Sequence, residues 1–224
     1  NFLADFLAGE FDGSYARGVH FQSNPTTGDR RTSGSAASLA GIESAVESGN
    51  APALNTAIDR LIASYAIVFG FSGLPLLYMG DELGMLNDHS FLEDPTKAED
   101  NRWIHRPAMD WNRVKNAQSG LGVEGQILTA FKSLIKARQR LHSLHAATTS
   151  QVSTLADGAV LIVRRKHAAG DLIQIYNLSE KTHYVPREGL LQPQMYEHIS
   201  ASEKFFGDHV EIPAYASWWL AAKH

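Results

Sequence analysis

The stretch QVSTLADGAVLIVRRKHAAGDLIQIYN, residues 151–177, alternates apolar and polar side chains with a period close to two. The turn signals Asp157-Gly158 and Ala169-Gly170-Asp171 divide it into short segments that are each typical of a strand. We predict strands at 151–155, 160–165, 172–177, 183–185, 196–199 and 210–219. Because short strands separated by turns characterise β-sandwiches, we predict an antiparallel β-sandwich domain over residues 146–224.

The hydrophobic period is different before residue 146. Apolar side chains recur there every three or four residues, which predicts helices at 36–48, 54–70 and 122–144. Between the last two lies GLPLLYMGDE (73–82), a run that is apolar without alternation and too short for a helix. Such a run is typical of a strand buried on both faces, and a helix followed by a buried strand indicates an α/β fold.

Composition and charge exclude several classes of protein. The chain has 20 basic and 24 acidic side chains and a net charge of −4, so we expect no nucleic-acid partner. No apolar stretch reaches membrane-spanning length, so we expect a soluble chain with no membrane partner. The absence of cysteine allows a reducing compartment and nothing indicates secretion, so we expect a cytoplasmic location. Phe2, Leu3, Phe6 and Leu7 already have helical spacing, which favours a piece of a longer protein.

Two irregular segments carry the polar and aromatic side chains that a binding site uses. Residues 11–35 are rich in turn-forming residues, and a loop longer than about 15 residues inside a compact domain tends to be functional or disordered. The interleaved Tyr15, Phe21 and three arginines favour an ordered functional loop over a mobile linker. The second segment, EDNRWIHRPAMDW (99–111), places six charged or imidazole side chains beside two tryptophans.

The adjacent carboxylates Asp81 and Glu82 follow the predicted strand at the end where ligands bind in α/β folds. A catalytic pair is one interpretation. Adjacent residues point in different directions, however, and glycoside cleavage needs two carboxylates about 5–9.5 Å apart across one bond, so a positioning role is favoured. The ten histidines contain no i, i+4 pair, and we predict no metal site.

Three motifs resemble one enzyme family. GLPLLYMGDELG (73–84) looks like the eighth-strand motif of the α-amylase family of glycoside hydrolases. FDGSYARGVHFQSNPTTGDRRTSG (11–34) and LNDHSFLEDPTKAEDNRWIHRP (86–107) are similar to the amylosucrase branch, which includes sucrose hydrolases. The resemblance covers nearly the whole chain and is weakest after Ala146. The first motif indicates the superfamily, whereas the other two indicate its sucrose-acting branch.

The resemblance implies a retaining enzyme on a (β/α)8 TIM barrel that needs no cofactor. The family motifs that carry the catalytic carboxylates lie upstream of Asn1, so this chain would have no catalytic residue, would be inactive alone and would depend on a missing N-terminal barrel half. It would comprise the end of an inserted loop subdomain (1–35), the last helices and eighth strand of the barrel (36–145) and the C-terminal β-sandwich (146–224).

Four substrate-binding residues follow from the same motifs. Arg102 matches the arginine that pairs with an aspartate across the bottom of the glucose pocket; the alternative is an ordinary surface charge stacked on Trp103. Arg31 matches an arginine on the fructosyl or acceptor side. Gln22 and Asn24 match amides that line the acceptor channel, and an amide both donates and accepts hydrogen bonds as sugar hydroxyls require. For Asn24, which precedes proline, a role in stabilising the turn is equally favoured.

The expected partners are sucrose and glucose or an α-glucan, but two departures leave the final acceptor open. Amylosucrases commonly have a proline and an aromatic residue where this chain has His20 and Ser23. Loss of the aromatic platform makes a sucrose hydrolase, which transfers the glucosyl group to water, a close alternative to an amylosucrase. A carbohydrate-binding fragment without activity is the alternative from another class.

Overall fold

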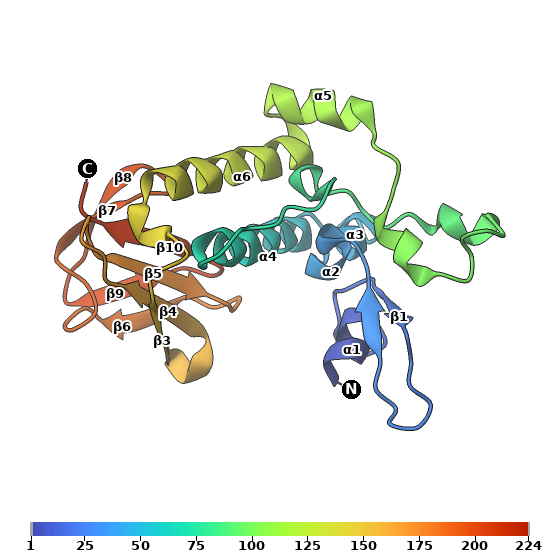
Figure 1. The fold of residues 1–224 in the computed structure, drawn as a ribbon, viewed down its shortest axis with the longest axis horizontal. Helices are drawn as coiled ribbons and strands as arrows, with labels where there is room; N and C mark the ends of the chain where they lie inside the picture. Colours follow the sequence, from blue (N-terminus) through green and yellow to red (C-terminus); the bar gives the residue numbers. More distant parts are fainter. Residues whose placement is uncertain (1, 224) are drawn as a thin grey trace. The chain divides into compact units, whose positions relative to one another are not determined.

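The computed structural model describes residues 2–223, and the chain divides into two compact units. Unit 1 comprises Asn1–Leu61 with Leu77–Leu128, and unit 2 comprises Ile62–Leu76 with Thr129–His224. The division runs through the helices α4 (Ala51–Gly70) and α6 (Gly122–Arg140), which therefore contribute to both units (Figure 1). It differs from the boundaries predicted at residues 35 and 145, and those domain assignments stay predictions.

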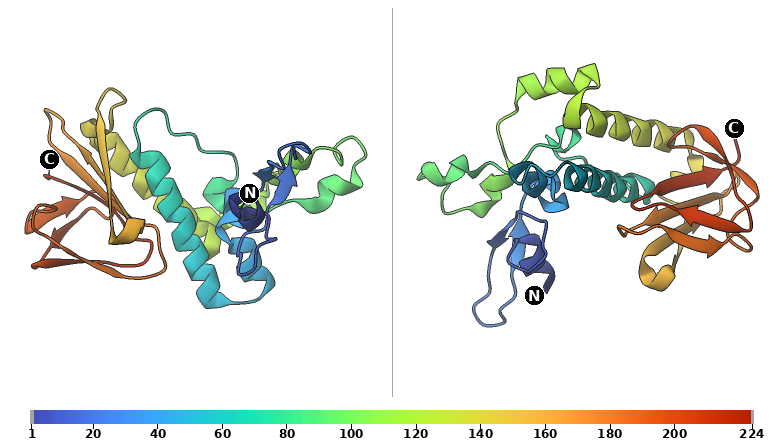
Figure 2. Two further views of the ribbon diagram at one scale, coloured as in Figure 1. Left: turned by 90° about the horizontal axis from the view of Figure 1, so that it is seen from below. Right: turned by 180° about the vertical axis from the view of Figure 1, so that it is seen from behind.

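Unit 2 contains two antiparallel sheets (Figure 2). The larger has the strand order β3-β4-β5-β10-β7-β8, and the smaller pairs β6 with β9. The strands are β3 (Ser150–Leu155), β4 (Val160–Arg165), β5 (Leu172–Asn177), β6 (His183–Pro186), β7 (Gln194–Glu197), β8 (Ser202–Phe205), β9 (His209–Ile212) and β10 (Ser217–Ala221).

The predicted antiparallel sheets are confirmed, with two differences in detail. The predicted strand 210–219 is wrong as one element, because the chain turns between β9 and β10 at residues 213–216, where Tyr215 has φ 52°. Proline has no N–H to donate to a sheet, and a positive φ ends an extended segment. β8 was not predicted, because Phe205 is its single apolar residue and the strand therefore shows no hydrophobic alternation.

The β core of unit 2 lies between the two sheets. Strands of the larger sheet supply side chains such as Val160, Ile175 and Leu220, and the smaller sheet supplies Val185 and Ile212. Each is at most 5% exposed. Burial of one such side chain contributes about 1.5–3 kcal/mol, so this cluster holds the sheets face to face.

A second, polar cluster in unit 2 surrounds Gly70 at the end of α4. The Tyr176 hydroxyl accepts hydrogen bonds from Gln174 Nε2 (2.8 Å) and Trp219 Nε1 (3.0 Å). Gln174 Nε2 also donates to the Gly70 carbonyl (3.0 Å), as does the buried Arg165 (3.4 Å). A Cβ at position 70 would overlap Tyr176 and Gln174, so this close approach requires glycine.

Arg138 of α6 holds the chain that follows α4. Its guanidinium donates to the carbonyls of Phe69, Phe71 (2.9 Å) and Gly73 (2.7 Å). The last carbonyls of a helix lack partners within the helix, so the half-buried guanidinium satisfies the Phe69 carbonyl together with two carbonyls of the chain that follows. Burial lowers the pKa of Arg138, yet three carbonyl acceptors compensate its charge locally.

Unit 1 is built from short elements. They are α1 (Phe2–Leu7), β1 (Val19–Phe21), β2 (Arg31–Ser33), α2 (Ala36–Ala40), α3 (Ile42–Glu47), α5 (Trp111–Ser119) and the 3-10 turns η1 (Asp81–Leu83), η2 (His89–Glu93) and η3 (Asn101–His105). The single helix predicted at 36–48 is wrong, because Gly41 has φ 99° and separates α2 from α3. The helix predicted at 122–144 ends earlier, at Arg140, and a 3-10 turn (His142–Leu144) follows it.

The predicted buried strand at 73–82 does not form. Residues 74–78 are outside any helix or strand, and Leu74 and Leu76 are 99% and 79% exposed. A parallel strand needs a hydrogen-bonded neighbour and a layer over each face, and the described residues offer this segment neither. Contiguous exposed apolar residues of this kind are typical of a surface that packs against another polypeptide segment. Among the described residues, no helix combines the length and the apolarity that crossing a bilayer requires.

Candidate functional site

The β1–β2 hairpin and η3 bring three of the four predicted site residues to one part of unit 1. Phe21 of β1 lies opposite Arg31 of β2 in the antiparallel register. Asn101 of η3 donates from Nδ2 to the His20 carbonyl (2.8 Å), and the Arg102 guanidinium lies 5.5 Å from the Phe21 ring centre. Gln22 follows Phe21 directly, so Gln22, Arg31 and Arg102 share one neighbourhood.

Arg102 forms a bidentate ion pair with Asp100, two residues earlier. The Nε–Oδ1 and Nη2–Oδ2 distances are both 2.8 Å. Hydrogen bonds from Arg102 lower the pKa of Asp100 to about 2, so the carboxylate remains charged at any ordinary pH. About half of the Arg102 side chain is exposed. Asp100 therefore sets the direction of the guanidinium while leaving part of it open to a ligand.

Gln22 and Asn24 occupy the tip of the hairpin. Gln22 is exposed and has φ 51°, an uncommon backbone conformation for a residue other than glycine. Asn24 Oδ1 accepts from the backbone N–H groups of Thr26 (2.9 Å) and Thr27 (3.2 Å). The Asn24 side chain therefore stabilises the turn, which is the structural role that its place before proline indicated.

Arg31 also borders an open hollow in unit 1. The hollow measures about 510 Å³ and is lined by Phe2, Leu3, Ala4, Leu7, Arg30, Arg31 and Thr32. Its wall is apolar apart from Thr32 and the two arginines, and Phe2 and Leu3 are 61% and 66% exposed. Arg31 thus combines an exposed guanidinium with an adjacent apolar surface, which suits the hydroxyl and carbon faces of a sugar.

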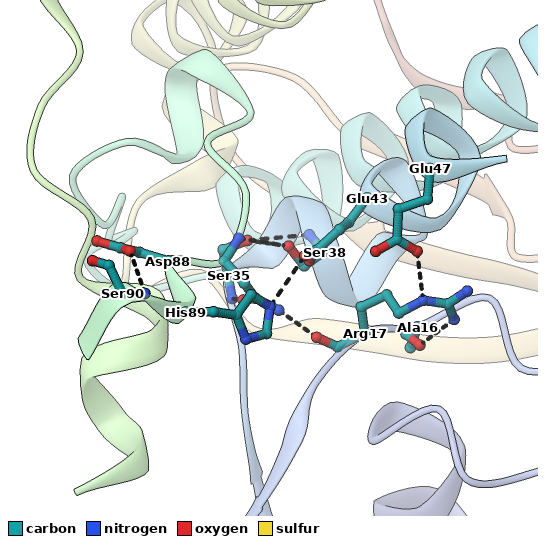
Figure 3. Close-up of polar contacts among 10 residues, drawn as sticks. Ala16, Arg17, Ser35, Ser38, Glu43, Glu47, Asp88, His89 and Ser90 are labelled. Atoms are coloured by element: carbon teal, nitrogen blue, oxygen red, sulfur yellow. Dashed lines mark hydrogen bonds and ion pairs between the residues drawn. The ribbon is translucent and has the colours of Figure 1, made fainter. Parts of the chain in front are cut away.

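Asn87, which sequence reasoning missed, ties three segments of unit 1 together around the hairpin. Its Oδ1 accepts from the Ser35 N–H (2.8 Å), and its own N–H donates to Ser38 Oγ (2.9 Å). Its Nδ2 donates to the carbonyl of Arg17. Figure 3 shows Ser35, Ser38 and Arg17 together, with Arg17 Nε donating to Glu47 Oε2 (3.0 Å). An isolated asparagine has no spacing that would reveal such a role from sequence.

Cations flank the indole of Trp103 in the charged loop. Lys97 Nζ and the Arg106 guanidinium each lie 5.2 Å from its ring centre. Burial, assisted by the nearby Arg106, lowers the pKa of His105. Ile104 is fully buried, and Asp110 caps α5 by accepting from the N–H groups of Asn112 and Arg113. The charge beside the tryptophans therefore orders the loop through cation–π contacts and a helix cap.

Asp81 and Glu82 lie in the turn η1 and do not face each other across a cleft in the described residues. Glu82 Oε2 accepts from the Gly80 N–H of its own loop (2.9 Å). Asp81 is 8% exposed. Since Glu82 is already engaged with its own backbone, the geometry favours the positioning role over a catalytic pair.

Residues 150–221, the β-domain of unit 2, match the protein family described as the amylosucrase C-terminal domain. This match covers the region in which the motif resemblance was weakest. It is consistent with a C-terminal domain of a glycoside hydrolase family, and it does not itself reach the hairpin or the charged loop.

Solved structures share the fold at low sequence identity. An α-amylase from Anoxybacillus is 18% identical over 75% of this chain and 33% of its own length, with a TM-score of 0.52. An α-amylase from Geobacillus thermoleovorans, solved with acarbose, is 15% identical over 100% of this chain and 42% of its own, with a TM-score of 0.55. The protein AmyP, solved with maltotriose, is 13% identical over 75% and 35%, with a TM-score of 0.60. The chain thus spans less than half the length of these proteins.

Proposed function

We propose that this chain is the C-terminal portion of a retaining sucrose-cleaving α-glucosyl enzyme of the amylosucrase type, which transfers glucose from sucrose to an α-glucan and releases fructose. The observation that carries the proposal is the match of residues 150–221 to the amylosucrase C-terminal domain. The motifs at 11–34 and 86–107 support the sucrose-acting branch independently, because they lie outside the matched residues.

The local geometry of unit 1 supports a sugar site at the hairpin. Three residues with the motif's guanidinium and amide groups lie on adjoining elements, although they are far apart in the sequence. We assign Arg102 to the closed end of the glucose pocket and Arg31 and Gln22 to the acceptor side, while Asn24 holds the turn beside Gln22. The fold relatives solved with acarbose and maltotriose support a glucan-type acceptor for this chain.

We assign the reacting carboxylates to a preceding part of the protein that would complete a (β/α)8 barrel. Formation of a β-glucosyl-enzyme expels fructose, and a second acceptor then takes the glucosyl group. The exposed run at 74–79 supports this assignment, since pairing with neighbouring strands would cover Leu74, Leu76 and Met79. Residues 1–35 would then end an inserted subdomain, and 36–145 would supply the last barrel elements.

A sucrose hydrolase is the second candidate. Ser23 stands where amylosucrases commonly have an aromatic side chain, and it lies exposed at the hairpin tip beside Gln22. A serine offers no stacking platform for an incoming sugar ring. Water would then compete better for the glucosyl-enzyme, and free glucose would accumulate with fructose.

The test uses the complete polypeptide that carries this chain. We expect Arg102→Ala to lower kcat/KM for fructose release from sucrose about 10- to 100-fold, because a hydrogen bond to a charged donor contributes about 1.5–3 kcal/mol. Arg113→Ala is the matched control, since Arg113 also pairs with a carboxylate in unit 1 (Glu124, 2.7 Å) but lies outside the motif residues.

Equal activity of the two variants would contradict the assignment of Arg102. Absence of sucrose cleavage by the unaltered polypeptide, with retained binding of maltooligosaccharides, would favour a carbohydrate-binding protein.

A further inference from the structure

Asp5, Glu10 and His20 converge in unit 1 from three successive segments. Asp5 lies on α1, Glu10 follows that helix, and His20 lies in the middle of β1. Backbone hydrogen bonds hold the segments in place: the Glu10 N–H donates to the Asp5 carbonyl (2.9 Å), and the Gly18 N–H donates to the Leu7 carbonyl (2.8 Å). Backbone hydrogen bonds therefore fix the segments that carry the three side chains.

One ligand atom from each residue lies within 4.8 Å of the other two. His20 Nε2 is 2.9 Å from Glu10 Oε2 and 3.6 Å from Asp5 Oδ1. These separations lie on either side of about 3.3 Å, the spacing between ligands held about 2.0–2.1 Å from a tetrahedral zinc ion. His20 Nε2 is thus spaced from each carboxylate oxygen approximately as two ligands of one ion are.

Hydrogen bonding does not account for these groups. Asp5 Oδ1 and both ring nitrogens of His20 have almost no access to solvent and make no hydrogen bond of acceptable geometry, although Arg30 Nη2 lies 2.8 Å from Asp5 Oδ1 and Glu10 Oε2 lies 2.9 Å from His20 Nε2. An oxygen that is close to Nε2 but poorly aligned for a hydrogen bond is the arrangement that two ligands of a shared ion adopt. A buried imidazole whose two nitrogens make no hydrogen bond is uncommon, and a bound ion would give Nε2 the partner that it lacks.

The charges favour a cation. The Arg30 guanidinium lies 2.8 Å from Asp5 Oδ1 and offsets one carboxylate. With His20 neutral, the second carboxylate leaves one negative charge uncompensated in a partly buried setting. Arg30 also reduces the attraction for a metal, so a divalent ion must gain from direct bonds to the imidazole and carboxylates. Zn²⁺ and the related divalent transition-metal ions, here called zinc-class ions, form such bonds. Calcium and magnesium prefer sites made only of oxygen ligands.

We propose that Asp5, Glu10 and His20 form a binding site for a zinc-class divalent ion, with water completing the coordination. The ion joins α1 and its following turn to β1, the strand that leads to the hairpin tip. Sequence spacing does not reveal this site, because each ligand comes from a different segment and no two follow a helical metal-binding pattern. The proposal does not depend on the sugar chemistry of the protein.

The test is titration of the metal-free full chain with Zn²⁺ by calorimetry, and with Co²⁺ by visible absorption, which reports the ligand geometry directly. We expect one site whose affinity falls at least about tenfold in His20→Asn and in Glu10→Gln. His89→Asn is the matched control, since His89 also lies beside a glutamate in unit 1 (Glu43, 3.4 Å) but has no third ligand among the described residues.

The Glu10 side chain is 57% exposed, so we expect the Glu10→Gln variant to fold. Its zinc affinity therefore tests the site even if the His20→Asn variant does not fold. Equal zinc affinity in the unaltered chain and both variants overturns the proposal. So does the absence of zinc binding by the unaltered chain.

Discussion

Tyr176→Phe tests the polar cluster that joins the end of α4 to the β-sheet in unit 2. Burial raises the pKa of Tyr176, so its hydroxyl stays protonated and acts both as donor and as acceptor. Removing the hydroxyl leaves one N–H of Gln174 and the indole N–H of Trp219 without their acceptor. Each buried unsatisfied donor costs about 1–3 kcal/mol, so we expect a loss of about 2–4 kcal/mol in the free energy of unfolding.

The assay is thermal unfolding followed by far-UV circular dichroism and tryptophan fluorescence, since Trp219 is fully buried in the affected unit. For a chain of this size, about 2–4 kcal/mol corresponds to a fall in Tm of roughly 5–15 °C. Tyr184→Phe is the matched control, because Tyr184 also lies on a strand of unit 2 but is 66% exposed. Surface substitutions of that kind stay within about 0.5 kcal/mol.

Equal Tm values for Tyr176→Phe and Tyr184→Phe would refute the reasoning. A double-mutant cycle with Trp219→Phe sharpens the result, because two groups that share a hydrogen bond give effects that are not additive. Strictly additive losses would show that the indole and the phenol act independently.

Three further predictions concern unit 1 and the exposed segment. Asn87→Ala removes hydrogen-bond partners from Ser35 and Arg17, so the free energy of unfolding measured in urea should fall by about 2–4 kcal/mol. A fall below about 0.5 kcal/mol would contradict the role of Asn87 in holding these segments together. Because burial lowers the pKa of His105 in the folded chain, the unfolded chain binds this proton more readily, so stability should decrease as pH falls below about 6.5. His105→Asn should reduce that pH dependence of Tm, and an unchanged pH profile would refute it. Leu76→Ser should leave the Tm of this chain unchanged but lower the Tm of the complete polypeptide, in which neighbouring strands would cover Leu76. An unchanged Tm in both would argue against such strands.

The β-domain was the part of the fold that sequence predicted best. β4 and β5 coincide with the predicted strands, because apolar runs bounded by Asp157-Gly158 and Gly170-Asp171 carry both the strand signal and its end points. β8 (Ser202–Phe205) lacked such a signal, since Phe205 is its single apolar residue. Hydrophobic patterning therefore found the strands that contribute to the core and the exposed edge strand β3, but missed β8 at the other edge of the sheet.

The apolar run at 74–79 shows why a strand prediction can fail locally. Its composition is that of a buried strand, yet a strand exists only when hydrogen-bonded neighbours are present, and sequence alone does not supply them. Gly41 is a second case, because its positive φ divides a helix whose apolar spacing continues across it. Periodicity reports which face is apolar, and backbone conformation decides where the element ends.

The sequence predicted only those residues of the candidate site that belong to local motifs. The motifs proposed roles for Arg102 and Arg31, but the pairing of Arg102 with Asp100 required coordinates, as did the choice between the two roles that the sequence left open for Asn24. Contacts between distant segments, such as Asn87 with Ser35 or Asp5 with His20, arise from the fold and leave no spacing signal. The sequence thus indicated the chemistry of single residues, and the structure showed their neighbours.

The most direct measurement of the central proposal is the product analysis of the complete polypeptide given sucrose or, separately, maltotriose. We predict that sucrose yields fructose in amounts equal to the glucosyl groups recovered in an α-glucan and in free glucose. Predominance of free glucose would identify the hydrolase form of the same enzyme. Cleavage of maltotriose without release of fructose from sucrose would contradict the assignment to the sucrose-acting branch.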